Sequence, residues 1–179
     1  MFQKKIERLL AEMEKYSESH DTAWSIPRDE ARFLHLMALL AKPKAMLEVG
    51  TSTGYSTIWL GLAAKKFGGK IVTIEYDPEK VRIARGNFKK AGMGKTITIL
   101  EGDANEILPK LRGKVDFAFL DGVKEEYLRH FKWILPCLRR GGIVAADNAG
   151  DFAGQMGDYL AFARGNKKLV STFIPIGNG

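Results

Sequence analysis

Apolar residues recur along the first part of the chain with the spacing of helices. Apolar residues at positions 6, 9, 10 and 13 predict an amphipathic helix at the start, and a second helix is predicted over about Arg28–Ala41. A polar loop from Ser17 to Pro27 separates the two. Residues 1–44 are therefore expected to form a helical segment ahead of the main body of the chain.

From Ala45 onward, short apolar runs alternate with helical patterns. Strands are predicted over Ala45–Val49, Lys70–Glu75, Thr96–Leu100, Val115–Leu120, Ile143–Ala146 and Ser171–Ile176. Helices are predicted over Tyr55–Phe67, Pro78–Lys90, Ala104–Leu111 and Glu125–Leu138. Strands that alternate with helices predict an α/β, Rossmann-like doubly wound fold, with a mostly parallel sheet and helices on both faces. Because no linker or repeat interrupts the 179 residues, we expect one domain, 1–179, with its core over 45–179.

Composition and charge narrow the class of protein. A single cysteine, Cys137, excludes an internal disulfide framework. The chain has no apolar run of the roughly 20 residues that cross a bilayer, and its N-terminus lacks the apolar region of a signal peptide, so a cytoplasmic location and no membrane partner are predicted. The net charge of +7 allows a polyanionic partner such as RNA. The alternative is a solvated lysine surface, because pairs such as Lys65-Lys66, Lys89-Lys90 and Arg139-Arg140 fall near predicted helix ends.

Two predicted strands end in carboxylates. Val115–Leu120 runs into Asp121, with Lys124 close behind, and Ile143–Ala146 runs into Asp147 and Asn148. The carboxyl ends of neighbouring parallel strands lie at one edge of a sheet. Two carboxylates and an amide oxygen are hard ligands of the kind that Mg²⁺ prefers, so a divalent cation site is predicted there. An aspartate at a strand end also caps the following helix, which is the structural alternative for either residue taken alone.

A glycine-containing turn follows the first strand at the same edge. Gly50 and Gly54 allow a ligand to approach the backbone closely, and Glu75 ends the next strand, where an acid typically binds ribose hydroxyls. The G-x-G-x-x-G spacing of dinucleotide-binding folds is absent, and Glu48 lies inside the strand. Glycine in a strand–helix turn is often purely structural, so the turn indicates a ligand site only in combination with Glu75.

With these motifs in view, the sequence resembles the class I S-adenosylmethionine-dependent methyltransferases, and within them the cation-dependent O-methyltransferases that include catechol and caffeoyl-CoA O-methyltransferases. The motifs that carry the resemblance are Asp29–Leu34, Glu48–Ser56, Glu75–Pro78, Glu101–Ala104, Phe119–Tyr127 and Ala146–Asn148. The resemblance implies an enzyme that uses S-adenosylmethionine (SAM) and a divalent cation, most simply Mg²⁺. It also implies that the helices within 1–44 cover the cofactor site and that the protein is a homodimer.

The resemblance implies a role for each cofactor-site residue. Glu48, Gly50 and Ser56 would surround the methionine portion, together with Ser52, Gly54 and Tyr55 of the same turn. Glu75 would hold the ribose hydroxyls, Tyr76 would pack on the adenine, and Gly102, Asp103 and Ala104 would line the adenine edge. Ile26 matches the loop that closes over the cofactor, and Asp121 borders the site.

The resemblance also implies the chemistry. Asp121, Asp147 and Asn148 would bind the cation, leaving positions for water and for two oxygens of a chelating acceptor such as a catechol. A phenol-like hydroxyl is mostly protonated at neutral pH, and binding to a cation favours its ionised form. Lys124 would accept the proton or hold the resulting oxyanion, beside Asp121, before in-line attack on the sulfonium methyl group.

Two segments depart from the family pattern. The acceptor segment over 149–157 has Phe152 as its only aromatic residue, so the identity of the acceptor does not transfer. The chain reaches Gly179 where the turn into the family's final antiparallel strand begins, so that strand is either absent or lies beyond the given sequence.

The sequence therefore leaves four functional hypotheses open. The first is O-methylation of a small molecule. The second is O-methylation of a hydroxylated RNA base. The others are a non-catalytic SAM-binding protein and, least favoured, a nicotinamide-dependent dehydrogenase.

Overall fold

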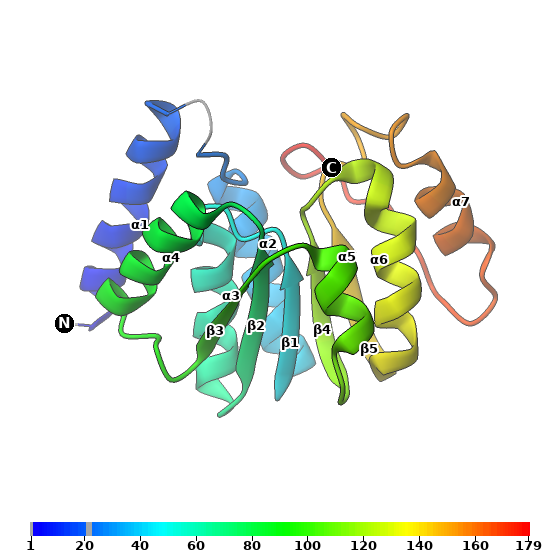
Figure 1. Cartoon of the computed structure of the whole chain (residues 1–179), viewed down its shortest axis with the longest axis horizontal. Coiled ribbons are helices and arrows are strands. Elements are labelled where there is room, and N and C mark those ends of the chain that lie inside the picture. The colour runs from blue at the N-terminus through cyan, green and yellow to red at the C-terminus, as the bar shows by residue number, and fades with distance from the viewer. Residues whose placement is uncertain (1, 21–22) are drawn as a thin grey trace.

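The protein is a doubly wound α/β domain in the computed structural model, which describes residues 2–20 and 23–179 (Figure 1). Its sheet contains β1 (Ala45–Val49), β2 (Lys70–Glu75), β3 (Ile97–Glu101), β4 (Val115–Leu120) and β5 (Leu138–Ala146). The strand order is β3-β2-β1-β4-β5, and every pairing is parallel. The order therefore reverses between β1 and β4, the position at which folds of this kind bind ligands.

Helices cover both faces of this sheet, as the sequence predicts. On one face lie α1 (Phe2–Glu18), α2 (Arg28–Ala41), α3 (Tyr55–Lys66) and α4 (Pro78–Lys90). On the other lie α5 (Ala104–Ile107), α6 (Tyr127–Ile134) and α7 (Gly157–Gly165). Short 3₁₀ turns span Leu108–Lys110, Lys124–Glu126 and Leu135–Cys137. None of the described helices is long and apolar enough to cross a membrane.

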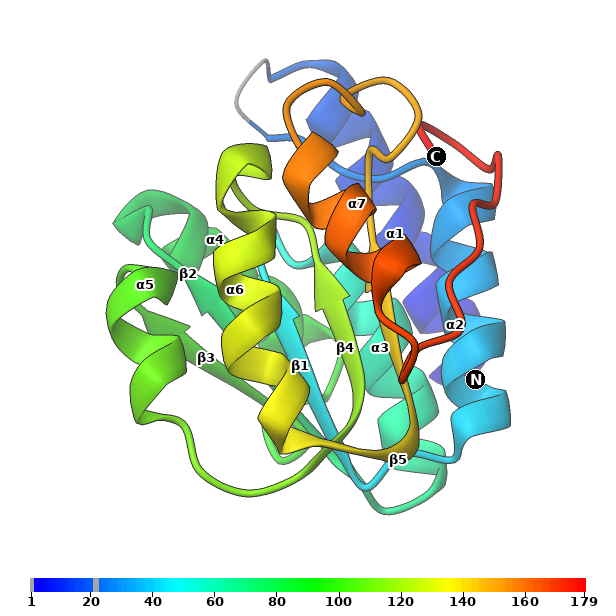
Figure 2. The same cartoon turned by 90° about the vertical axis from the view of Figure 1, so that its right-hand side faces the viewer.

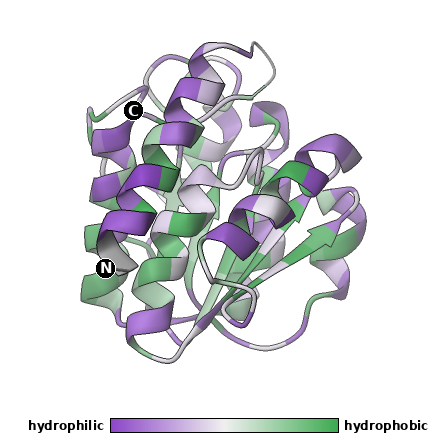
Figure 3. Ribbon diagram, turned by 90° about the vertical axis from the view of Figure 1, so that its left-hand side faces the viewer, coloured by the Kyte–Doolittle hydropathy of each residue, from purple (hydrophilic) through white to green (hydrophobic). Residues whose placement is uncertain are grey.

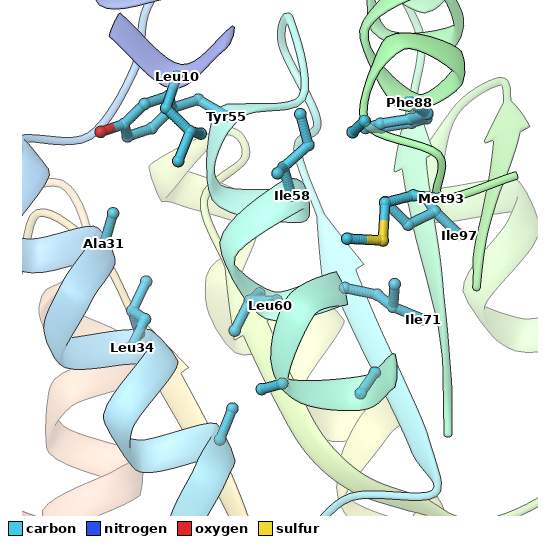
Figure 4. Close-up of a cluster of buried hydrophobic side chains, with 14 of the residues drawn as sticks. Leu10, Ala31, Leu34, Tyr55, Ile58, Leu60, Ile71, Phe88, Met93 and Ile97 are labelled. Atoms are coloured by element: carbon cyan, nitrogen blue, oxygen red, sulfur yellow. The ribbon is translucent and has the colours of Figure 1, made fainter. Parts of the chain in front are cut away.

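The first core lies between the sheet and α1 to α4. Helix α3 is buried on nearly every side, so Ile58 and Leu60 pack among residues from all neighbouring elements (Figure 4). The stripe predicted on the first helix, represented by Leu10, closes this core from outside. Full burial of each such side chain contributes about 1.5–3 kcal/mol. Hydrophobic residues accordingly follow the strands and the interior, whereas hydrophilic residues dominate the outer helices (Figure 3).

A second core lies between the opposite face of the sheet and α5 to α7. Side chains alternate between faces along a strand, so Met46 contributes to the first core, and Leu47 and Val49 to the second. Tyr127 and Phe131 of α6 pack there, and both stack edge-on against Tyr159 of α7. This packing fixes the start of α6, which follows directly on the loop that carries Lys124.

The strand predicted over Ser171–Ile176 is wrong. This segment is irregular, its first residues are exposed, and it runs outside the sheet alongside α2 (Figure 2). The carbonyls of Asn178 and Gly179 accept hydrogen bonds from the amides of Gly150 and Ala149, at 3.1 and 2.6 Å. Pro175 offers no N–H for a strand ladder, which disfavours pairing along β5. The described residues contain no antiparallel sixth strand.

Two predicted helices end earlier than expected at prolines. Pro109 and Pro136 each fall in a 3₁₀ turn, and the chain after Pro136 enters β5 at Leu138 rather than at Ile143. Residues 139–142 form an irregularity in the pairing of β5 with β4, because Val115 pairs with Leu138 but Phe117 pairs with Ile143. The sequence pattern did not predict α7.

Candidate active site at the carboxyl ends of the strands

The turn between β1 and α3 passes very close to the end of β4. Gly50 has φ +91°, and a Cβ on it would lie 2.2 Å from the carbonyl oxygen of Asp121. Gly54 has φ +92° and meets the ring of Phe88, so it also cannot carry a side chain without strain. The two glycines therefore bring the backbone of this turn against both neighbouring elements at the ligand-binding edge.

Glu75, at the end of β2, holds this turn in place. Its Oε2 accepts hydrogen bonds from the amides of Thr51 and Ser52, at 3.1 and 2.8 Å, and its Oε1 accepts from Tyr76 and Asp77, at 3.0 and 3.1 Å. A carboxylate has about four acceptor positions, so the backbone uses all of them here. The buried hydroxyl of Ser52 has no hydrogen-bond partner among the described residues. A polar ligand beside Glu75 and Ser52 would satisfy that group.

Glu48 is fully buried beneath the turn. Its carboxylate accepts hydrogen bonds from the hydroxyls of Ser56, Thr57 and Thr73, at 2.7, 2.5 and 2.6 Å. Burial raises the pKa of Glu48 to about 7, although the three hydroxyls favour the ionised form. Glu48 and Ser56, both predicted at the cofactor site, are thus bonded to one another.

The remaining predicted cofactor residues lie in different environments. Tyr76 is 70% exposed beside Glu75, where a planar ligand has access to it. Gly102 and Ala104 lie beyond β3, with Asp103 between them as the exposed N-cap of α5, accepting from the amide of Asn105 at 2.8 Å. Ile26 is buried ahead of α2.

Tyr55 differs from this group because its side chain points into the first core. Its ring is buried beside Leu10 (Figure 4), and its hydroxyl donates to Glu14 of α1. Burial raises the pKa of Tyr55 to about 12. At the cofactor turn, Tyr55 therefore contributes its backbone only.

Asp121 and Lys124 form a polar pair at the end of β4. The Nζ of Lys124 donates to Oδ1 of Asp121 and to the hydroxyl of Tyr127, each at 3.0 Å. Burial raises the pKa of Asp121 to about 7, with Lys124 opposing the shift and the nearby Asp147 adding to it. Tyr127 is fully buried, and burial raises the pKa of its hydroxyl well above the ordinary value. Sequence reasoning gave Tyr127 no role, although it lies three residues after Lys124.

Asp147 and Asn148 lie next to Asp121, as the parallel strands require. The last residues of β4 and β5, Leu120 and Ala146, are paired, so the two aspartates follow at the same level. Asp147 and Asn148 are both buried, and Asn148 has φ +66°, a conformation that asparagine tolerates better than most residues. The structure therefore brings together the three residues predicted as cation ligands.

The donor chemistry of these residues fits a divalent cation of the Mg²⁺ type. No three His, Cys, Asp or Glu side chains converge as a metal-binding group in the part of the chain that the structure describes. A cation here would thus depend on two carboxylates and the Asn148 amide oxygen. Mg²⁺ commonly binds through one or two carboxylates and keeps several water molecules, so this set suits it.

Glu30 of α2 is a further acid at this edge that the sequence analysis did not single out. It is buried, and burial together with the adjacent Asp147 raises its pKa to about 9. The Asn178 backbone contributes an opposing hydrogen bond. Gly177 has φ +62° and its Cα faces the Glu30 carboxyl group, which leaves no room for a side chain. The helical pattern does not distinguish Glu30 from the other inner-face positions of α2, so the sequence does not predict it as a site residue.

Comparison with known proteins identifies the family. Residues 3–159 match the family model of O-methyltransferases. A catechol O-methyltransferase from Niastella koreensis is 38% identical over 144 residues, which are 78% of this chain and 65% of that protein. A caffeoyl-CoA O-methyltransferase from Stellaria longipes is 33% identical over 146 residues, 78% of this chain and 60% of that protein. The chain thus spans slightly less than two thirds of the length of these curated relatives.

Solved structures give the same assignment. The O-methyltransferase TomG from Streptomyces achromogenes, involved in tomaymycin synthesis and crystallised in complex with SAM, superposes with a TM-score of 0.81 at 26% identity, covering 89% of this chain and 78% of that one. The predicted class I methyltransferase fold is therefore confirmed, and the dehydrogenase alternative loses its support. The chain belongs to the O-methyltransferase family.

Proposed function

We propose that this protein is a SAM-dependent, divalent-cation-assisted O-methyltransferase that acts on a catechol-like or other chelating hydroxyl of a small molecule. The observation that carries the proposal is the convergence of two sites at one edge of the sheet. The turn between β1 and α3, held by Glu75, meets Asp121 through the close approach of Gly50. A cofactor and a cation bound at these sites would be neighbours.

The cofactor would bind between the ends of β1, β2 and β3. Glu75 is the acceptor for the ribose hydroxyls, which would replace or share its present bonds from Thr51 and Ser52. The exposed ring of Tyr76 offers a face for the adenine. The TomG complex with SAM supports this choice of cofactor.

Asp121, Asp147 and Asn148 would hold the cation together with the acceptor. When bound, the cation favours ionisation of an acceptor hydroxyl, and the cofactor supplies the methyl group. Lys124 places a positive charge beside this site, fixed by Asp121 and Tyr127, and stabilises negative charge on the acceptor oxygen. The names of the relatives, which describe catechol and caffeoyl-CoA enzymes, support an acceptor with neighbouring oxygens.

Calorimetry tests the binding order. Titration with S-adenosylhomocysteine (SAH) is expected to give micromolar affinity, and a catechol added to that complex is expected to bind only when Mg²⁺ is present. Methyl transfer to the catechol is then measured with and without a chelator. Cofactor binding without any methyl transfer would favour a non-catalytic SAM-binding protein, and absence of cofactor binding would overturn the proposal.

A matched pair of variants tests the cation site. Asp147→Ala is expected to abolish Mg²⁺-dependent catechol binding and to lower turnover by roughly 100-fold or more, because one of two carboxylate ligands is lost. The control, Asp151→Ala, removes an exposed carboxylate from the same loop and is expected to leave both properties within about twofold. Equal behaviour of the two variants would contradict the cation assignment.

A further inference from the structure

The edge of the sheet opposite the active site is strongly basic. Five segments lie there because each lies at or next to the end of a helix or the start of a strand, and the parallel strands all begin at that edge (Figure 1). The segments are residues 42–44, 65–70, 89–95, 110–114 and 139–140. They contain 13 of the 28 lysines and arginines of the chain and no aspartate or glutamate. All 13 side chains belong to exposed residues.

Few of these cations are neutralised within the protein. Arg139 pairs with Asp116 at 3.1 Å, and backbone carbonyls accept hydrogen bonds at 2.5 to 3.4 Å from Lys44, Lys65, Arg112 and Lys114. Lys66, Lys70, Lys95 and Arg140 form no ion pair with any residue that the structure describes. The alternative explanation, in which these cations serve only to complement helix ends, therefore accounts for only some of the cations on this basic face. The carboxylates lie mainly at the other edge, where Glu75, Glu101, Asp121 and Asp147 end or follow strands.

We propose that this basic face binds the phosphate backbone of a nucleic acid, independently of sequence and apart from the active site. Clustered Lys and Arg on one face are the electrostatic footprint of such binding. The chemistry favours a phosphate backbone over a membrane surface, because none of the exposed large apolar side chains lies in the five segments, and apolar insertion adds to the affinity of peripheral proteins for membranes. Strand β1 separates this face from the active-site edge by about 16 Å, so phosphates bound at this face would anchor the protein without occupying the active site.

The test compares two triple variants with the same loss of charge. Lys66→Gln, Lys70→Gln and Lys95→Gln are combined on the basic face. Lys15→Gln, Lys132→Gln and Lys167→Gln are combined as a control, at exposed positions outside the five segments. Affinity for a fluorescent RNA duplex and for a DNA duplex of equal length is measured by anisotropy from low to high salt. Thermal unfolding and SAH binding confirm that both variants remain folded.

The wild-type protein is expected to bind at low salt with a steep salt dependence. The basic-face variant should bind roughly tenfold or more weakly and show a log–log salt slope shallower by about 2 to 3, whereas the control should stay close to wild type. Preference for the RNA or the DNA duplex identifies the source of the backbone. Equal losses in both variants, no duplex binding at low salt, or stronger binding to phosphatidylserine vesicles than to either duplex would overturn the proposal.

Discussion

Lys124 is held by the carboxylate of Asp121 and the hydroxyl of Tyr127, so its positive charge has a fixed position beside the proposed acceptor site. Lys124→Met is expected to lower kcat by about 100- to 10,000-fold, because the charge beside the acceptor oxygen is lost, with SAH affinity almost unchanged. Lys15→Met, on an exposed position of α1, serves as the control. Initial rates and calorimetry provide the two measurements, and an unchanged kcat would rule out a catalytic role for Lys124.

Tyr127 acts through Lys124 if it is a positioning residue. Its hydroxyl accepts from Lys124 at 3.0 Å and is fully buried. Tyr127→Phe is expected to lower kcat several-fold without changing KM for SAM. In a Lys124→Met background it should lower kcat no further, because the group that it orients is gone. A second loss of the same size in the double variant would indicate a separate structural effect.

Glu48 gives the stability of the protein a distinct pH dependence. Its pKa is raised by burial from 4.5 to about 7, so the folded state binds the proton more tightly than the unfolded chain does. The resulting stabilisation is complete below pH 4.5 and is lost as the pH rises through about 7, a loss of roughly 3 kcal/mol. Glu48→Gln keeps the side chain neutral at every pH and so removes this pH dependence. Urea unfolding at several pH values should show the stability of the wild type falling over that range relative to the variant, and parallel curves would contradict the assignment.

At the scale of elements, the β1–α3 turn depends on its glycine. Gly50→Ala would place a methyl group 2.2 Å from the Asp121 carbonyl at φ +91°, and is expected to cost about 2–5 kcal/mol. Gly68→Ala is the matched control, because φ is +66° there but no atom lies within 4 Å of the new Cβ, so about 1–2 kcal/mol is expected. Denaturant unfolding separates the two, and similar costs would show that close approach to β4 does not matter.

The alternation of strands and helices was predictable, because each strand is a short apolar run and each helix has its own periodicity. Acids at strand ends, such as Glu75 and Asp121, were predictable for the same reason, since parallel strands deliver them to one edge. What periodicity does not encode is long-range packing. The inward direction of Tyr55, the burial of Glu30 and the path of residues 171–179 each depend on contacts with distant elements. Pro136 could have signalled the early end of α6, which the predicted helix over Glu125–Leu138 passed over, but nothing in the pattern marked the early start of β5.

At the scale of the whole molecule, the homodimer stays a prediction. The apolar side of α1 packs into the first core of the same chain. Only the charged outer side of α1 is therefore free to contact a second subunit. On α2, by contrast, Leu36 and Leu40 are 57% and 75% exposed. Light scattering is expected to give twice the 19.9 kDa of the chain, and Leu36→Glu with Leu40→Glu is expected to return it to one. A mass of one chain for the wild type would contradict the dimer.

The separation of charge between the two edges of the sheet also determines the orientation in which the protein would adsorb to a charged surface. A sulfonate bead attracts the edge that carries Lys66, Lys70 and Arg140. Adsorbed in this orientation, every molecule would turn the ends of β1, β2 and β4 toward the liquid, so small molecules could still reach Glu75 and Asp121. A quaternary-amine bead repels that edge, and the net charge of +7 gives the protein little affinity for it. Immobilisation on the first material should therefore retain the protein and preserve access to the site.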